Sequence, residues 1–581
     1  MVLVLFGFSH ASAADIILPG ATTAELSGPY EDRRQAEVTF GQRSYYLAPW
    51  RAYMDTWPAQ RYRDCLGVSF NANQQQEDAL AQVLAEAGFH QVRVEWGWGK
   101  VAWDGKQMKD AAGLVTQMQT MRRHGLRPLI LLNGHHGAPC PTRDIAAVLK
   151  ADAKQGDREI ILADTTQVRP GYCGFSSLTD YKAGYPLIDH VDAASGRCVL
   201  SAPLPKDLKA GGITLIELRY RPFSGATFKD GQVNPACVET LQGWMDYVAA
   251  VTSTAKAGLG TEKATDAGFD LEVWNELTFG SNFLSIDNYC DPHPEYATPI
   301  SYRQHGREAK GVEAILPMTV DWVADPANRC PRVKVISGFS NQRPWDSGTQ
   351  MWPGQAGFSR HYYTGLKPLR LDPQNVDRPD SRPLNALGVA DGKPDGKEWH
   401  GAIPGSFFVP VHSVAMPEWW FYGYKTEFIT RDIQPFPSTS SGPVSFADHH
   451  RFSHPGTGRP AEVWETETNL DRSDFTDVLM KAAKCPKEDP RLATILHEIG
   501  ARGLLRQTLF SVHKGIATMT VFSTNGGDTY LGVLPDAFFT LLTADGGKLT
   551  DRVRAAAGPQ LAVIGRVTKR LSGGEPIDVA R

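Results

Sequence analysis

Two short carboxylate motifs could carry chemistry in this sequence. Glu276 ends the apolar run at residues 272–276 (EVWNE), and Glu467 ends the similar run at residues 464–467 (WETE). A glycosidic bond can be broken by one carboxyl group that protonates the leaving oxygen and a second that attacks the anomeric carbon or activates water. We therefore expect Glu276 and Glu467 to act as such a pair, provided that the fold brings the two strand ends together.

Strand-like and helix-like segments alternate along most of the chain, which is typical of a parallel sheet covered by helices. Strands are expected at residues 66–71, 90–95, 128–133, 269–276, 333–337, 357–363, 461–467 and 516–523. Helices are expected near residues 73–88, 114–125, 238–254, 302–323, 492–513 and 549–571. The pattern predicts an α/β fold, a (β/α)8 TIM barrel, whose chemistry lies at the C-terminal ends of the strands.

This rhythm is interrupted twice. Residues 139–234, after the third strand, hold short β-branched runs among Gly, Pro and Asp, which predicts a small inserted β-rich module beside the active site. A long irregular Pro- and Gly-rich loop follows the sixth strand, and loops of this length are usually functional. We assign the catalytic barrel to residues 61–138 and 235–581, and residues 15–60 to an N-terminal segment that packs on it.

The amino-acid composition limits the classes of partner that this protein could bind. Charged residues make up 21% of the chain and the formal net charge is -4, so no basic field is present to gather nucleic acid. Residues 1–13 (MVLVLFGFSHASA) are a short apolar run with an Ala-Ser-Ala end but no basic start. They predict a signal peptide over residues 1–14 and an exported protein, periplasmic or secreted. No other stretch approaches a membrane span. We expect a carbohydrate partner and no cofactor, and the sequence leaves the oligomeric state open.

The eight cysteines permit two interpretations. In an oxidising compartment Cys140 could pair with Cys237 at the base of the insertion, and Cys173 with Cys198 inside it. Buried free thiols fit the sequence equally well. None of the spacings is typical of a zinc site, so no metal site is predicted.

Taken together, the motifs resemble the retaining glycoside hydrolases of clan A, most nearly family 39. The resemblance rests on the Asn275-Glu276 pair closing strand four, the His361-x-Tyr363 motif closing strand six, a Thr-Glu pair closing strand seven, and an inward Arg93 on strand two. It covers roughly residues 61–137 and 238–571. It implies a double-displacement hydrolase with Glu276 as acid/base and Glu467 as nucleophile.

The resemblance also implies roles for neighbouring residues. Asn275 would bind the sugar 2-hydroxyl, Tyr363 would orient the nucleophile, and His135 would contact the sugar beside the scissile bond. Members of such families act on β-xylosides, α-iduronides or bacterial exopolysaccharides.

Other site residues are expected from the strand pattern itself. Side chains alternate along a strand, so Glu465 should share a face with Glu467 and lie deeper, where Arg93 could pair with it. Trp96 could line the cleft or pack in the core. His361 is expected in the active site. The eighth strand ends without a Trp, and Trp419 and Trp420 on the long loop are candidate sugar platforms.

Several alternatives stay open at this point. Thr426-Glu427 also resembles the nucleophile motif, although the chain after Glu467 continues the barrel better. The barrel could bind glycans without cleaving them, as part of an exopolysaccharide system. A metal-dependent hydrolase centred on His135, His136 and Glu95 is a third possibility.

Overall fold

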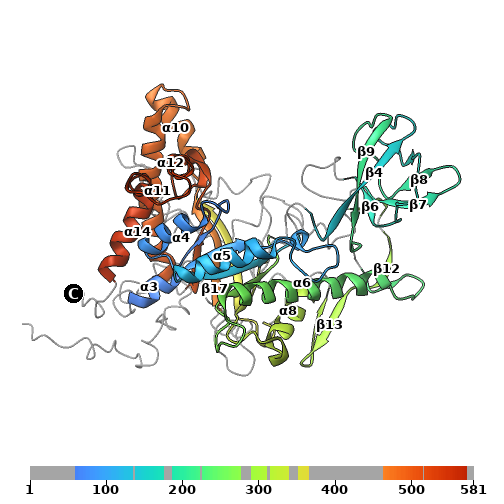
Figure 1. Ribbon diagram of the computed structural model, residues 1–581, viewed down its shortest axis with the longest axis horizontal. Helices are drawn as coiled ribbons and strands as arrows, with labels where there is room; N and C mark the ends of the chain where they lie inside the picture. The colour runs from blue at the N-terminus through green and yellow to red at the C-terminus, as the bar shows by residue number, and fades with distance from the viewer. Residues whose placement is uncertain are drawn as a thin grey trace, which may run out of the picture.

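Eight parallel strands close into a barrel at the centre of the molecule (Figure 1). The computed structural model describes residues 59–134, 138–175, 186–222, 225–276, 289–292, 294–310, 314–338, 351–364, 462–513 and 516–571. The barrel strands are β1 (Leu66–Ser69), β2 (Gln91–Glu95), β3 (Arg127–Leu132), β11 (Asp270–Val273), β15 (Val335–Ser337), β16 (Gly357–Thr364), β17 (Glu462–Leu470) and β18 (Thr518–Val521). They follow one another around the barrel in chain order, β18 closing on β1, so the predicted (β/α)8 barrel is confirmed.

Helices cover the outside of this barrel. They are α3 (Ala59–Cys65), α4 (Glu77–Ala87), α5 (Ala111–Arg123), α6 (Pro235–Leu259), α8 (Ile315–Ala324), α10 (Ser473–Ala483), α11 (Pro490–His513), α12 (Asp536–Ala544), α13 (Asp551–Ala555) and α14 (Gly558–Leu571). Their ends follow local chemistry. The Asp110 carboxylate accepts the Gly113 N–H at the start of α5, and Gly88 ends α4 in a left-handed conformation. Among the described residues, no helix combines the length and apolar character that crossing a membrane requires.

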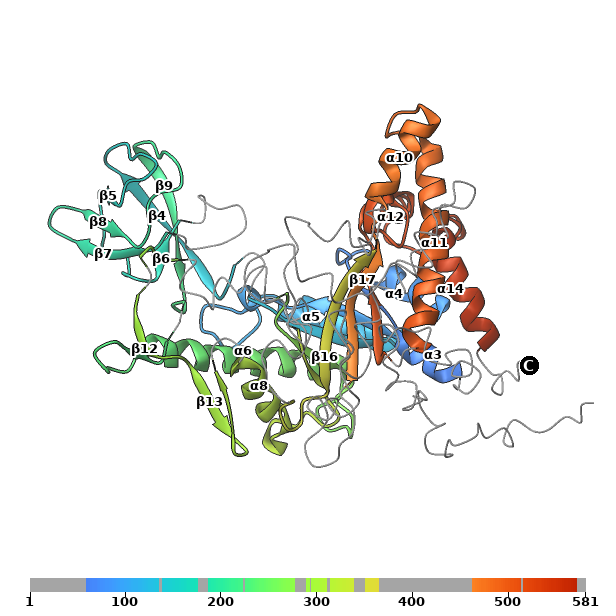
Figure 2. The ribbon, with the colours of Figure 1, turned by 180° about the vertical axis from the view of Figure 1, so that it is seen from behind.

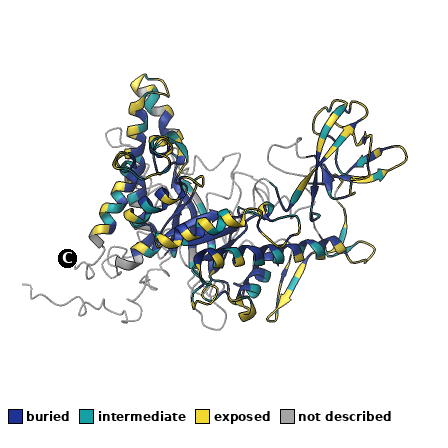
Figure 3. Ribbon diagram, viewed as in Figure 1, coloured by how far each residue is buried: buried dark blue, intermediate teal, exposed yellow. Residues whose placement is uncertain are grey.

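The barrel strands are buried on both faces. Every residue of β1, β11, β15 and β18 is buried, as expected for parallel strands with helices outside and packed side chains inside. Figure 3 shows the same pattern, with buried strands at the centre and exposed residues along the outer faces of the helices. A polar side chain inside such a barrel must therefore find its partners across the interior.

The insertion after β3 forms a separate β-rich module with its own core. Strands β4 (Thr142–Leu149), β9 (Gly211–Leu218) and β6 (Cys173–Gly174) form one sheet, and β5 (Glu159–Ile161), β8 (Arg197–Leu200) and β7 (Ile188–Asp192) form another. A hydrophobic cluster that includes Leu215 and Phe175 joins them. In both views the module lies beyond the N-terminal end of α6, away from the barrel (Figures 1 and 2).

Helix α6 supports this module. Its 25 residues correspond to about 37 Å, more than the short barrel strands need. Near its N-terminus, Glu239 accepts a hydrogen bond from the Tyr172 hydroxyl at 3.1 Å and pairs with Arg219 at 2.8 Å. Since helices run antiparallel to the strands, the N-terminus of α6 and the module lie on the side of the barrel where the strands end.

One predicted helix is partly a hairpin. Residues 302–323 were expected to be helical, but the first part forms β13 (Ser301–Gln304) and β14 (Arg307–Lys310), and only α8 follows. His305 and Gly306 both have positive φ, 53° and 69°, which is the two-residue turn that suits tight antiparallel hairpins. The prediction was wrong there because the His-Gly turn outweighed the helical spacing.

Further expectations concerned the cysteines, the N-terminal segments and the long loop. All eight cysteines are free thiols in the structure, so neither of the two possible disulfides is present. The expected signal peptide, nearly all of the segment 15–60, and the long loop after the sixth strand lie outside the described residues.

The separate core of the module leads to a prediction about stability. Leu215 is fully buried in that core, so Leu215→Ala should destabilise the module by about 2–5 kcal/mol through lost burial and a residual cavity. Hydrogen exchange should accelerate in β4 and β9 but not in the barrel strands. Val148→Ala, on the neighbouring strand at 50% exposure, is the control and should have little effect. Equal acceleration in β1 and β18 would contradict two separate cores.

Candidate active site

A buried arginine organises the polar interior of the barrel. From β2, Arg93 donates through Nε to Glu272 at 2.6 Å, through Nη1 to Glu467 at 2.6 Å and through Nη2 to Asn275 at 2.8 Å. Burial alone would lower the pKa of Arg93, but the charges of Glu272 and Glu467 outweigh it and hold that pKa above its ordinary value. Because β2, β11 and β17 are not neighbours in the barrel, these contacts cross its interior.

An irregularity in β17 decides which carboxylates face inward. Arg360 pairs with Glu465, but the next residue of β16 pairs with Glu467, so Thr466 is an extra residue, a β-bulge. The Glu465 carboxylate accepts hydrogen bonds from Ser511 on the outer helix α11, at 2.8 and 3.0 Å. Glu465 and Glu467 therefore do not share a face, and Arg93 pairs with Glu467 rather than with Glu465 as the alternation predicted.

Glu467 is held as a carboxylate by its neighbours. Arg93 donates to Oε1, and the Tyr363 hydroxyl donates to Oε2 at 2.7 Å. Burial raises the pKa of Glu467, but the charges of His361 and Arg93 and the two hydrogen bonds outweigh burial and lower it to about 2. Burial first, and then the charge of Glu467, raise the pKa of Tyr363 well above its usual range. Tyr363 thus stays a donor to an ionised Glu467.

Backbone strain places Glu276 at the barrel mouth. The strand expected to reach Glu276 ends at Val273, and both Trp274 (φ 71°) and Glu276 (φ 44°) adopt the left-handed conformation. Such residues cost about 1–3 kcal/mol each and persist where surrounding structure enforces them. The enforcing contacts are hydrogen bonds from Trp274 N to Leu132 O, from Glu276 N to Gly338 O and from Gly338 N to Val273 O.

His361 joins the two sides of the site. It lies on β16, two residues before Tyr363, and its side chain is 1% exposed. Its Nδ1 lies 2.8 Å from Glu276 Oε1 and 3.5 Å from Glu467 Oε2, and its Nε2 lies 2.9 Å from Thr466 Oγ1. The Glu276 side chain is 20% exposed and that of Glu467 11%, so both carboxylates remain open to a ligand from the mouth.

The two carboxylates and His361 are close enough to act on one atom. One oxygen of Glu276, one oxygen of Glu467 and one ring nitrogen of His361 all lie within 4.8 Å of one another. Among the described residues these are the side chains that could together approach a cation. The histidine contacts both carboxylates directly at 2.8 and 3.5 Å, and Arg93 and Tyr363 already occupy the oxygens of Glu467, so the arrangement favours proton sharing over metal ligation.

The structure brings together most of the residues expected from the sequence. Glu276, Glu467, Asn275, His361, Tyr363 and Arg93 form one connected cluster. Trp96 does not join it, because it is 1% exposed and donates its indole N–H to Gln117 on α5. His135 and His136 lie outside the described residues, as do Glu427, Trp419 and Trp420 on the long loop.

Two residues of the cluster were missed from the sequence. Glu272 is fully buried and bonds Arg93, and Thr466 donates to Glu272 Oε1 at 2.7 Å. The sequence could have indicated Glu272, because an acidic residue within a buried strand needs a paired charge or hydrogen-bond donor. No sequence feature indicated Thr466, because its side chain points inward only as a result of the bulge.

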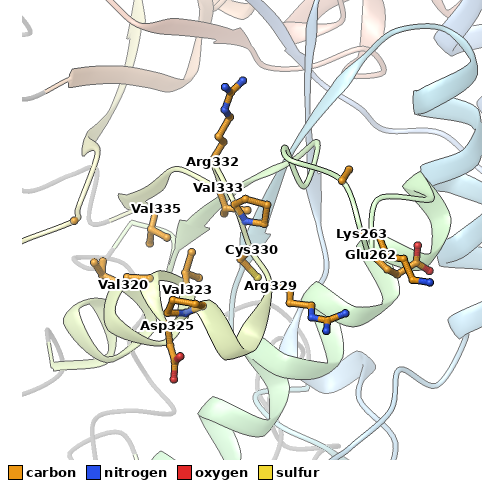
Figure 4. A pocket seen from close by; sticks show the side chains of 15 residues that line it. Glu262, Lys263, Val320, Val323, Asp325, Arg329, Cys330, Arg332, Val333 and Val335 are labelled. Atoms are coloured by element: carbon orange, nitrogen blue, oxygen red, sulfur yellow. The ribbon is translucent and has the colours of Figure 1, made fainter.

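A pocket of about 670 Å³ lies elsewhere (Figure 4). Val335 at the start of β15 and Arg329, Cys330 and Arg332 in the preceding loop line it, which places it at the N-terminal end of the strands. None of the clustered side chains lines this pocket. The chemistry is therefore assigned to the opposite end of the barrel.

Comparisons with known proteins give similar structures only. No protein-family model and no curated protein matches the chain. A family 39 glycoside hydrolase from the gut symbiont Bacteroides cellulosilyticus WH2 is similar with TM-score 0.38 and 12% identity, over 88% of this chain and 65% of its own. The exo-β-1,4-mannosidase Op5Man5 from Opitutaceae bacterium strain TAV5 has TM-score 0.33 and 11% identity, over 87% and 59%.

A GH5-4 broad specificity endoglucanase from an uncultured bacterium is similar with TM-score 0.37 and 9% identity, over 94% of this chain and 100% of its own. This chain spans less than two thirds of the length of the first two structures. These three solved structures are glycoside hydrolases.

The close approach of the backbone at Gly338 leads to a prediction about the turn that carries Glu276. A Cβ on Gly338 would overlap the carbonyl oxygen of Trp274, so Gly338→Ala must displace the turn that carries Glu276. We expect a stability loss of about 1–3 kcal/mol and a kcat loss on the order of 10²-fold, measured by thermal unfolding and by steady-state kinetics. Gly212→Ala, whose Cβ would meet nothing within 4 Å, is the matched control. Unchanged kcat in Gly338→Ala would refute the constraint.

The hydrogen bond from Tyr363 to Glu467 leads to a prediction about the pH dependence of activity. Tyr363→Phe removes a donor to ionised Glu467, a contact worth about 1.5–3 kcal/mol, so the pKa of Glu467 should rise from about 2. Activity that needs ionised Glu467 would then be lost at a higher pH as the solution is acidified. The acid limb of the kcat/KM profile reports this change. Tyr172→Phe removes a similar bond to Glu239 in the module and should leave the limb in place.

Proposed function

We propose that this protein is a retaining glycoside hydrolase that cleaves an oligo- or polysaccharide by double displacement. The observation that carries the proposal is the pair of opposed carboxylates at the barrel mouth, with one oxygen of Glu276 within 4.8 Å of one oxygen of Glu467. Retaining enzymes place their two carboxyl groups about 5–5.5 Å apart, whereas inverting enzymes need roughly 6.5–9.5 Å to admit a water. The spacing supports direct attack by one carboxylate.

The environments of the two carboxylates support different roles. Glu467 has a pKa of about 2 and is bonded through both oxygens, so it is ionised and fixed, as a nucleophile must be. The Glu276 side chain contacts Nδ1 of His361 and is the more exposed of the two carboxylates. It can therefore exchange a proton with a bound ligand. Opposite environments for two neighbouring carboxylates are the usual basis of separate acid and nucleophile roles.

In the first step Glu276 gives its proton to the glycosidic oxygen while the bond from that oxygen to the anomeric carbon breaks. A Glu467 oxygen forms the new bond to the anomeric carbon, giving a covalent glycosyl ester. In the second step Glu276 takes a proton from water, whose oxygen displaces Glu467 and restores both carboxyl groups. Asn275, held by Arg93 beside this centre, is placed to bond a sugar hydroxyl.

The two roles predict different defects. Glu467→Ala should abolish turnover, because no ester can form. Glu276→Ala should lower turnover of glycosides with poor leaving groups on the order of 10²–10⁴-fold, and azide should partly restore turnover of an activated aryl glycoside by attacking the ester. A panel of aryl glycosides and bacterial polysaccharides, with NMR of the anomeric product, measures activity and stereochemistry together.

Glu462→Gln is the matched control, since Glu462 lies at the other end of β17 and pairs with Lys334. Full activity in both site variants would exclude the assignment, and an inverted anomer would exclude double displacement. Binding of a glycan by the wild type without any hydrolysis would favour a glycan-binding barrel instead. Loss of activity with a chelator, restored by a divalent metal, would favour a metal-dependent hydrolase.

A further inference from the structure

The buried Glu272 carboxylate touches both halves of the candidate site without facing solvent. Its side chain is 0% exposed. Oε2 accepts from Arg93 Nε at 2.6 Å, and Arg93 in turn holds Glu467. Oε1 accepts from Thr466 Oγ1 at 2.7 Å, and Thr466 in turn contacts His361. One oxygen thus leads to the nucleophile and the other to the acid/base.

From Glu272 through Thr466 to His361, the direction of each hydrogen bond is fixed. Glu272 is the ion-pair partner of Arg93 and therefore only accepts. A threonine hydroxyl has a single hydrogen, and Thr466 gives it to Glu272, so Oγ1 can only accept at its contact with His361 Nε2. The hydrogen in that contact must come from Nε2. This fixes the position of one hydrogen on the imidazole ring.

The remaining ring nitrogen then faces Glu276. His361 Nδ1 lies 2.8 Å from Glu276 Oε1, a distance that needs one hydrogen between the two atoms. With Nε2 already bearing a hydrogen, Nδ1 is the ring nitrogen that shares a proton with Glu276: the proton lies on Nδ1 when the ring is charged and on Glu276 when the ring is neutral. The tautomer thus leaves this shared proton between His361 and Glu276, where it can be given to a leaving group.

We propose that Glu272 is a positioning residue that, through Thr466, fixes the hydrogen of His361 on Nε2 and so leaves Nδ1 to share a proton with Glu276. This deepens the proposed function and rests on it for the role of Glu276. Neither Glu272 nor Thr466 contacts the reacting atoms. Through Arg93, the same carboxylate also fixes Glu467, so one buried group aligns both catalytic carboxylates.

Glu272→Gln tests the direction of this chain with little change in shape. The amide oxygen can face Arg93, and the amide nitrogen must then face Thr466 and donate to it. Thr466 would turn its hydrogen toward His361 Nε2, and the ring hydrogen would move to Nδ1, where it stabilises ionised Glu276. Thr466→Val breaks the same chain while leaving the pair of Arg93 and Glu272 intact. Thr466→Ser keeps the hydroxyl and is the conservative control.

Kinetics distinguish this role from a merely structural one. In Glu272→Gln and Thr466→Val, kcat/KM for a glycoside with an alkyl or sugar leaving group should fall on the order of 10²-fold, with a much smaller loss for a dinitrophenyl glycoside that needs little acid assistance. The alkaline limb of the pH profile should move to lower pH. Thr466→Ser should keep the wild-type ratio between the two substrates. Equal losses on both substrates with an unmoved pH profile would overturn the proposal.

A readout that needs no activity separates this proposal from the proposed function. Nitrogen-15 NMR of histidine-labelled protein, with the His361 signals identified by their loss in His361→Asn, reports which ring nitrogen bears the hydrogen. The wild type should show hydrogen on Nε2, and Glu272→Gln should show it on Nδ1. The same tautomer in both proteins would overturn the proposal even if glycosides are cleaved. The expected change in a protein without glycosidase activity would overturn only the proposed function.

Discussion

The placement of one buried cation underlies the site. The Arg93 guanidinium cannot be left unpaired in the barrel interior, since burying an isolated charge costs far more than a protein's net stability allows. Glu272, Glu467 and Asn275 meet it with three charge-assisted hydrogen bonds of 2.6–2.8 Å. The converse also holds, because the positive charge of Arg93 offsets the repulsion between the carboxylates of Glu272 and Glu467, which it bonds at the same time. The position of Glu467 therefore depends directly on a side chain that is only 6% exposed.

Local departures from regular structure turn this charge cluster into the candidate active site. The bulge at Thr466 directs two consecutive side chains inward, so β17 supplies both a carboxylate for Arg93 and a hydroxyl for Glu272 and His361. The left-handed residues after β11 direct Asn275 and Glu276 over the barrel mouth. Regular strands could not place these groups together, because side chains alternate and would send every second one outward. The left-handed residues Trp274 and Glu276 are held by backbone hydrogen bonds to Leu132 and Gly338 of the neighbouring segments.

The inserted module adds a second level of organisation. It has its own hydrophobic cluster and attaches at the side of the barrel where the strands end, along the extended α6. The contacts of Glu239 with Tyr172 and Arg219 join it to that helix. A module in this position can shape access to the mouth of the barrel without altering the charge cluster inside it, because no residue of the cluster comes from the module.

The sequence by itself determined the architecture and the residue types of the site. Eight apolar strands, separated by amphipathic helices with recognisable ends, have few alternatives to a closed parallel barrel, and strand ends in such a barrel converge on one face. That was enough to place Glu276, Glu467, His361 and Tyr363 together. Only the tertiary structure decided the direction of the side chains. A β-bulge has no signature in the sequence of one strand, because it is defined by the pairing with the neighbouring strands. In β17 the bulge turned Glu465 to the face opposite to the expected one and directed Thr466 inward. The partners of Arg93 were likewise decided across the barrel, because a buried charge chooses among distant residues by three-dimensional distance and not by spacing along the chain.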